Sequence, residues 1–256
     1  MAGKSGSSSV ESLVTAPRKF GVYLASRIFA YNLLKRAYIE EPTKEFINLL
    51  KEEALLDVFP HGVTDGAITD GVELVGSYFN QADALEDAKM DDLVADYTNL
   101  FIGPGKLPAP PWESVYRSKD RLTFQEETIQ VRHMFYKYQL ESSKIHKEPD
   151  DHVALELDFM GHLSTRILDE AKKKEKSWSQ VKKLILAQKD FLNEHMLKWL
   201  PKFSDDVVTN SRTDFYRGFG KILIGYLRVE SKELAELAKV VRHQIRQEKK
   251  LKVASG

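Results

Sequence analysis

A short acidic segment holds the residues whose types and spacing most directly suggest chemistry. Glu148, Asp150 and Asp151 place three carboxylates within four positions, and the imidazole of His152 follows at once. Carboxylates grouped in this way can pair with guanidinium groups through charge-assisted hydrogen bonds. An imidazole beside acids can also titrate near neutral pH. The segment predicts a site for a basic ligand, and the structural alternative is that Asp150 or Asp151 only caps a following helix.

A second unusual segment, residues 103–112, contains four prolines and ends at Trp112. Proline fixes the backbone φ angle, so the segment cannot be helical and loses little entropy when it is ordered. A stiff loop that carries a large aromatic ring is suited to binding. We therefore expect Trp112 to be at least partly exposed in a groove. The alternative is a rigid connector whose indole fills the core.

Sequence motifs of common enzyme classes are missing from the chain. It has no His-Glu-x-x-His, Gly-x-Ser-x-Gly, Gly-x-x-x-x-Gly-Lys or Glu-x-x-His pattern and no cysteine. His152 with Glu156, and Asp158 with His162, have a four-residue spacing that could hold a metal on a helix. Such pairs are common on helix surfaces when 30% of the residues are charged. We predict no catalytic residue, no metal site and no cofactor.

These segments lie between stretches of helical periodicity, and alternating strand patterns are missing. The pattern predicts an all-α fold, a single helical bundle-like domain of about nine or more helices over residues 16–250. Residues 1–9 are rich in Gly and Ser, and residues 1–15 are predicted to be a disordered N-terminal leader or a remnant of an expression tag. Thr43 is a plausible N-cap. The predicted helices are 17–38, 43–56, 70–80, 82–101, 123–138, 151–173, 179–199, 213–227 and 231–250.

Charge and hydropathy limit the possible partners. The 38 Lys and Arg residues equal the 38 Asp and Glu residues, so we expect no nucleic-acid partner. No apolar stretch is long enough for stable membrane insertion. Without a sign of an oxidising compartment, we expect a cytoplasmic protein, as a monomer or weak homodimer. We interpret the one basic bias, residues 242–252, as a solvated last helix or a frayed tail.

Taken together, residues 97–105, 109–116 and 148–160 resemble the TorD/DmsD/NarJ family in order and spacing. The similarity is strong over residues 97–163 and weaker at His195, Trp199 and residues 215–217. The resemblance implies an all-helical, cofactor-free cytoplasmic chaperone. Its implied partner is the precursor of a molybdoenzyme catalytic subunit and, in the TorD/DmsD branch, the twin-arginine signal peptide, or leader, of that subunit.

The resemblance also implies a leader-binding and client-binding set of residues. The acids of this set would pair with the leader arginines, and the aromatic residues would form an apolar groove. Tyr97 departs from the family pattern, because a close relative has tryptophan at this position. Two alternatives remain, a NarJ-like chaperone for a nitrate-reductase-type subunit that is not exported, and a helical adaptor without leader specificity. The predicted site consists of Tyr97, Leu100, Phe101, Pro111, Trp112, Ser114, Tyr116, Glu148, Pro149, Asp150, Asp151 and His152.

Overall fold

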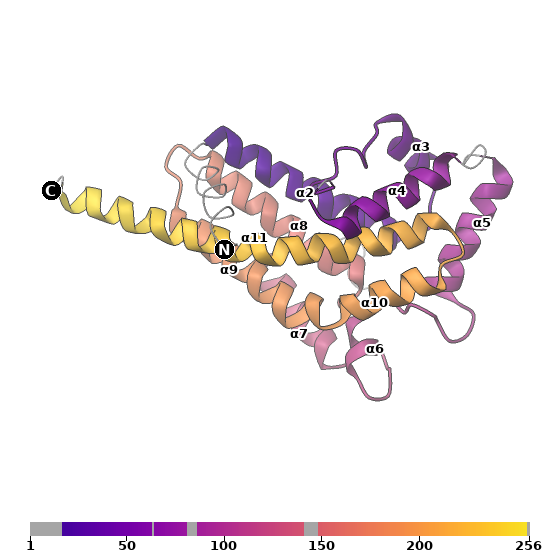
Figure 1. The fold of residues 1–256 in the computed structure, drawn as a ribbon. Coiled ribbons are helices and arrows are strands. Elements are labelled where there is room, and N and C mark those ends of the chain that lie inside the picture. Colours follow the sequence, from indigo (N-terminus) through magenta and orange to yellow (C-terminus); the bar gives the residue numbers. More distant parts are fainter. Residues whose placement is uncertain (1–16, 63, 81–85, 141–147, 255–256) are drawn as a thin grey trace, which may run out of the picture.

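The computed structural model describes residues 17–62, 64–80, 86–140 and 148–254 (Figure 1). These residues form an all-α protein, which confirms the predicted fold class. The predicted leader, residues 1–15, lies outside the described residues, and the domain boundaries stay a prediction. The elements are α2 (Pro17–Ile39), α3 (Lys44–Glu52), α4 (Gly66–Asn80), α5 (Asp87–Tyr97), the π-helical turn η1 (Thr98–Ile102), α6 (Glu113–Arg117), α7 (Glu126–Tyr138), α8 (Val153–Lys172), α9 (Trp178–Phe191), the π-helical turn η2 (Leu192–Met196), α10 (Leu197–Asn210) and α11 (Asp214–Ala254).

Two pairs of long helices form the frame of the molecule. α2 lies along α8, and α4 lies along α11 (Figure 1). α9 and α10 also pack against α11, so this one helix touches much of the bundle. The short helices α6 and α7 lie at the edge, next to α10 and α8 respectively. This arrangement leaves the start of α8 beside α6 and α7, where the two unusual segments of the sequence converge.

Glycines set the distance between α4 and α11. A Cβ atom on Gly71 would lie 2.6 Å from the carbonyl oxygen of Gly218, and a Cβ on Gly218 would lie equally close to the carbonyl oxygen of Gly71. About two turns further along α11, a Cβ on Gly225 would lie 2.8 Å from Ile68 Cγ1. Real side chains do not approach this closely, so the two backbones touch only because these positions lack a side chain.

The start of α11 is fixed by a buried carboxylate from another helix. Asp96 of α5 is fully buried and accepts hydrogen bonds from the backbone N–H groups of Arg212, at 3.1 Å, and Thr213, at 2.8 Å. The Thr213 hydroxyl also donates to it, at 2.7 Å. A carboxylate at this place satisfies donors that have no partner within the helix and interacts favourably with the helix dipole.

α11 continues where the sequence predicted a break between residues 227 and 231, so that prediction is wrong. The interruption in the apolar pattern is real, but Glu230 is buried as the partner of Arg27 on α2 and does not mark a turn. Arg27 Nε donates to Glu230 Oε1 at 2.9 Å, and the Tyr31 hydroxyl donates to the same oxygen at 2.7 Å. Arg27 Nη2 also donates to Gln188 Oε1 on α9, at 2.9 Å.

A second predicted boundary, the end of a helix at Trp199, is also wrong. The chain remains helical through η2 and α10 to Asn210, with Pro201 inside α10. The π-helical turn η2 comes directly before α10, and the chain bends between α9 and α10 (Figure 1). π-helical turns and prolines are both known causes of helix kinks. Pro201 therefore coincides with a change of direction without ending the helix.

No helix in the described ranges combines the length and the apolar content needed to cross a bilayer.

We predict that Arg27→Met lowers the free energy of unfolding by about 3 kcal/mol or more, because it leaves the Glu230 carboxylate buried without its cation. The double variant Arg27→Met/Glu230→Gln should recover part of this loss. Urea unfolding measures both. The control is Lys35→Met, which breaks the partly exposed ion pair with Asp158 and should cost less than about 1 kcal/mol. Equal losses in Arg27→Met and Lys35→Met would contradict the prediction.

Candidate functional site

The proline-rich segment and the acidic segment are joined through their backbones. The N–H of Glu113 donates to the carbonyl oxygen of Asp151 at 3.0 Å. The N–H of Val153 donates to the carbonyl oxygen of Pro111 at 2.9 Å. These bonds place Trp112 opposite His152 in an isolated antiparallel β-bridge. The structure thus brings together two segments that are separated by more than thirty residues in the sequence.

The Asp151 side chain holds this junction from the inside. It is fully buried, and Oδ2 accepts the backbone N–H of Ser114 at 2.8 Å. Oδ1 accepts the hydroxyl of Thr128 on α7, also at 2.8 Å. Its neighbour Asp150 is buried as well and forms an ion pair with Arg132 of α7. Both acids therefore have partners within the protein and tie α6 and α7 to the start of α8.

The N-cap of α8 is His152, so the alternative in which Asp150 or Asp151 only caps this helix is wrong. The Nδ1 atom of His152 accepts the backbone N–H of Ala154 at 3.1 Å, so the imidazole does what a capping carboxylate would do. The indole of Trp112 packs edge-on against this ring, with 6.0 Å between the ring centroids. As expected, Trp112 is partly exposed. Its Nε1–H is buried and has no acceptor among the described residues.

Two other predicted aromatic residues, Tyr97 and Phe101, lie in the core. Tyr97 is 3% exposed and its hydroxyl donates to the carbonyl oxygen of Tyr38 at 3.3 Å. Phe101 packs between the rings of Phe203 and Tyr216, at centroid distances of 6.0 and 5.6 Å. These side chains join α5 and η1 to α10 and α11. In this conformation they are covered by protein.

Exposure divides the predicted site into two groups. Trp112, Tyr116 and Glu148 reach solvent, and the hydroxyl of Tyr116 donates to Asp206 at 3.1 Å. The rest of the set is buried, namely Tyr97, Leu100, Phe101, Pro111, Ser114, Pro149, Asp150, Asp151 and His152. Contact between any of these buried side chains and a ligand stays a prediction, and it requires movement of the segments that cover them.

A small cavity of about 340 Å³ lies where η1 leads into the proline-rich loop. Gly103 and Gly105 have φ angles of 99° and 101°, which other residues adopt only with strain, so these glycines shape the loop. Ile102 beside them is 62% exposed. The residues lining the cavity are Ala95, Thr98, Asn99, Gly103, Pro104, Lys106 and Pro108.

A buried acidic cluster behind the junction was not predicted from the sequence. Glu113 is fully buried, and its two carboxylate oxygens lie 2.7 Å from Arg117 Nη1 and 2.8 Å from His195 Nδ1. Glu156 of α8 is fully buried too, and its Oε2 accepts the indole N–H of Trp199 at 3.1 Å. The available signal was a lone carboxylate within the apolar run of residues 153–157.

Burial controls the charge of Glu156. Removal from water raises the pKa of this carboxyl well above its usual value, and the negative charge of Glu113 raises it further. Burial and the nearby Glu113 carboxylate therefore both favour the neutral form of Glu156.

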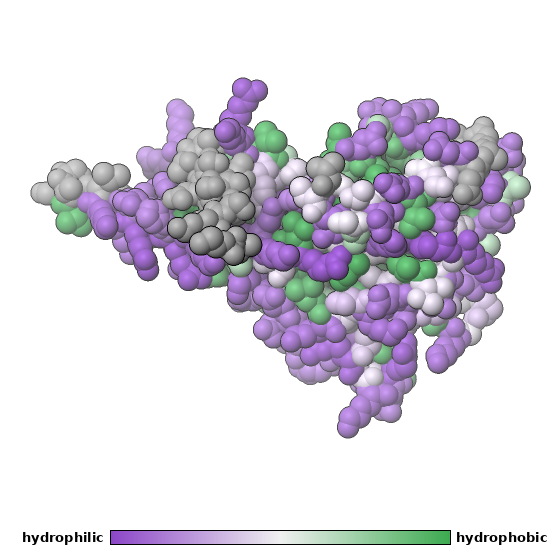
Figure 2. Space-filling model, viewed as in Figure 1, coloured by the Kyte–Doolittle hydropathy of each residue, from purple (hydrophilic) through white to green (hydrophobic). Residues whose placement is uncertain are grey.

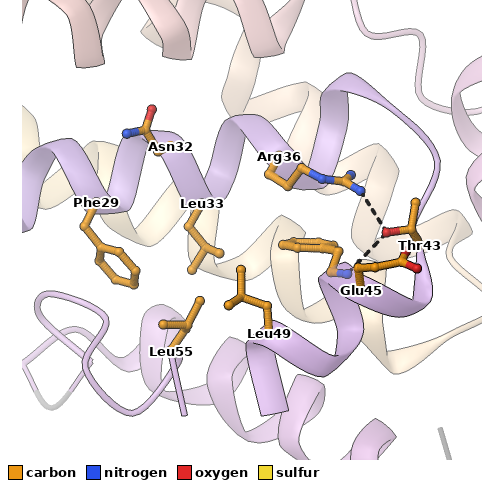
Figure 3. Close-up of a pocket in the computed structure, with 9 residues that line it drawn as sticks. Phe29, Asn32, Leu33, Arg36, Thr43, Glu45, Leu49 and Leu55 are labelled. Carbon is orange, nitrogen blue, oxygen red and sulfur yellow. Dashed lines mark hydrogen bonds between the residues drawn. The ribbon is translucent and has the colours of Figure 1, made fainter. Parts of the chain in front are cut away.

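A separate apolar groove of about 400 Å³ lies between α2 and α3 (Figure 3). Phe29, Leu33, Leu49 and Leu55 point into it, and Leu49 is 50% exposed. Arg36 closes one end, where its guanidinium lies 4.5 Å from the ring centre of Phe46. The sequence analysis did not identify this groove, because its walls come from two helices that each show only ordinary amphipathic spacing.

Comparison with known proteins identifies the central part of the chain. The sequence model described as nitrate reductase delta subunit matches residues 68–205. The protein named chaperone protein TorD from Aliivibrio salmonicida is 28% identical over 205 residues, which is 80% of this chain and 93% of the relative. The TorD proteins of Aliivibrio fischeri and Vibrio vulnificus are 29% and 26% identical, over 66% and 78% of this chain and 75% and 91% of their own. Residues 68–205, which the family model matches, contain the whole junction, whereas the α2–α3 groove lies before them.

We predict that Asp151→Ala lowers the free energy of unfolding by about 2 to 4 kcal/mol, because the N–H of Ser114 and the hydroxyl of Thr128 lose a buried acceptor. Asp151→Asn should cost about 1 kcal/mol, since the amide oxygen keeps one of the two bonds. Chemical denaturation gives both values. Asp169→Ala, at an exposed position of α8, is the control. If Asp151→Ala is as stable as this control, Asp151 does not hold the junction.

A second prediction concerns pH. The folded-state pKa of Glu156 is raised, so the unfolded chain releases this proton first as pH rises, and stability falls from about pH 4.5 upward until the folded pKa is passed. Glu156→Gln removes this dependence. Its free energy of unfolding should exceed that of the parent by an amount that grows as pH rises above about 4.5. Denaturation at a series of pH values is the measurement, with exposed Glu175→Gln as control. Parallel pH profiles for the parent and Glu156→Gln would refute the assignment.

Proposed function

The chain belongs to the nitrate reductase delta subunit family, whose sequence model covers more than half of it, and from this premise we propose that it is a molybdoenzyme maturation chaperone of the TorD/DmsD kind. Its relatives are named chaperones, which is a non-enzymatic role. We propose that it binds the precursor of the catalytic subunit and its twin-arginine leader in the cytoplasm. The observation that supports this most directly is the junction of the proline-rich and acidic segments, which lies within the matched region.

The exposed part of the junction suits a peptide with both charge and apolar surface. Glu148 is partly exposed and close enough to Tyr97 that its charge adds to the effect of burial in raising the pKa of that phenol. A carboxylate at this place can pair with a leader guanidinium. The partly exposed ring of Trp112 can contact apolar or cationic groups of a peptide.

The buried part of the predicted site has a supporting role in this proposal. Asp151 binds Ser114 and Thr128, and His152 caps α8 and packs against Trp112. Together they hold the indole in one orientation. A preorganised contact loses less entropy when the ligand binds. We therefore propose that Asp151 and His152 influence leader affinity through the position of Trp112, while direct contact with the leader arginines by Asp151 stays a prediction.

A nitrate-reductase-type client that is not exported is the second possibility, because the matching family model carries that name. The two possibilities differ in the leader. A chaperone for an exported subunit should bind the isolated twin-arginine leader, whereas a chaperone for a retained subunit should bind only the larger client. The leader titration below separates them, and an adaptor without specificity would not distinguish a scrambled peptide from the leader.

We predict that a twin-arginine leader peptide binds the protein with micromolar or sub-micromolar affinity, which is a binding free energy of about 8 to 10 kcal/mol in magnitude. Replacing both leader arginines by glutamine, or introducing Trp112→Ala, should weaken binding about tenfold or more, because each change removes one side of the contact. Titration calorimetry measures these affinities. A melting curve of each variant shows whether the fold is intact.

Two variants serve as controls for this experiment. Tyr136→Ala removes an aromatic ring that is 58% exposed on α7 and should leave leader affinity unchanged. Leu49→Asp places a charge in the α2–α3 groove. If Leu49→Asp abolishes binding while Trp112→Ala does not, the leader occupies the groove and the proposed site is wrong.

A further inference from the structure

Four helix segments that are distant in the sequence meet at one end of the molecule (Figure 1). The ring of Phe20, in the first turn of α2, lies 6.2 Å from that of Trp178, the first residue of α9. Tyr23 of α2 donates its hydroxyl hydrogen to Glu233 of α11 at 3.0 Å. Leu168, near the end of α8, packs beside Gly21. Beyond this meeting point the last turns of α11 project away from the bundle (Figure 1).

These segments concentrate positive charge. Residues 17–19, 169–183 and 239–250, which we call the basic end, contain thirteen Lys and Arg residues and four Asp and Glu residues. The whole chain has a net charge of zero, so the remaining sequence has nine more acids than bases. In the sequence only residues 242–252 stand out as basic, because the other contributions come from separate places. The fold is what gathers them.

The positive side chains of the basic end are available to a partner. Lys173 pairs with Glu170, and Lys239 pairs with Glu236. The other bases of the basic end have no ion pair with any residue that the structure describes. The surface of the projecting part of α11 is strongly hydrophilic (Figure 2). The exposed bases are Arg18, Lys19, Lys172, Lys173, Lys174, Lys183, Lys239, Arg242, Arg246, Lys249 and Lys250.

We propose that the basic end binds the surface of an anionic lipid bilayer. Basic residues held near such a surface each contribute to binding, and a projecting helix can lie along it. Two exposed apolar side chains accompany the charges, Val22 on the first turns of α2 and Val253 at the end of α11, at 65% and 82% exposure. Apolar side chains among bases fit the boundary between lipid headgroups and acyl chains.

The aromatic residues in and beside the basic end argue against a nucleic-acid partner. Proteins that bind single strands stack bases on exposed rings. Here Phe20 and Trp178 are only 2% and 6% exposed, and Tyr23 is bonded to Glu233. Electrostatic binding to the bilayer also fits the finding that no described helix could span it, because the contact is peripheral. The proposal concerns a surface away from the Trp112 junction and does not rest on the identity of the client.

The test is sedimentation of the full chain with vesicles of phosphatidylcholine alone and with vesicles in which about a third of the lipid is phosphatidylglycerol. We expect binding to the anionic vesicles only, and loss of binding when salt is raised, because the contact is between screened surface charges. Two triple variants, Arg242→Gln/Arg246→Gln/Lys249→Gln and Lys172→Gln/Lys174→Gln/Lys183→Gln, should each bind at least about tenfold more weakly.

The control variant is Lys51→Gln/Lys119→Gln/Lys198→Gln, which removes the same charge from exposed positions elsewhere. It should bind anionic vesicles like the parent. Equal weakening in all three variants would show that net charge and not the basic end decides the outcome, and would overturn the proposal. So would equal binding to neutral vesicles, no binding to either kind of vesicle, or binding to a short single-stranded RNA without binding to anionic vesicles.

Discussion

The guanidinium of Arg27 lies within the bundle, and a charge removed from water must find partners inside the protein. Glu230 of α11 and Gln188 of α9 supply them. Gln188 donates in turn to Ser164 and to the carbonyl oxygen of Met160, both on α8, at 2.8 Å. One chain of hydrogen bonds therefore connects α2, α11, α9 and α8. Apolar packing tolerates small rotations of a helix about its axis. These hydrogen bonds are directional, so they fix the rotation of each of the four helices.

The same requirement shapes the candidate site. Asp151 and Glu113 are acids without solvent exposure, and each is satisfied by specific donors, so the segments that carry them have little freedom. The partly exposed Trp112 rests on this rigid base. A surface that must hold a flexible peptide benefits from such support, because the entropy cost of ordering then falls mainly on the peptide. The buried acids can thus matter for binding without touching the ligand.

Sequence reasoning predicted those features that depend on local chemistry. Thr43 caps α3 as expected. The proline-rich and acidic segments also converge, but only the family resemblance had placed them in one site. It was wrong where tertiary contacts decide. Glu230 interrupts the apolar pattern of α11 because its partner lies on α2, and His152 rather than an aspartate caps α8 because Asp151 is engaged by Ser114 and Thr128. An apolar stripe also cannot show which aromatic residues are covered.

The contacts along α11 fix the direction in which each of its faces points. Gly218 and Gly225 must face α4, and Glu230 must face Arg27, within a single uninterrupted helix. Each residue added to an α-helix turns everything after it by about 100°. A one-residue insertion between Gly225 and Glu230 would keep every side chain present and yet direct the carboxylate away from its cation. The helix can accept many substitutions on its outer face, but not a change in length between these fixed points.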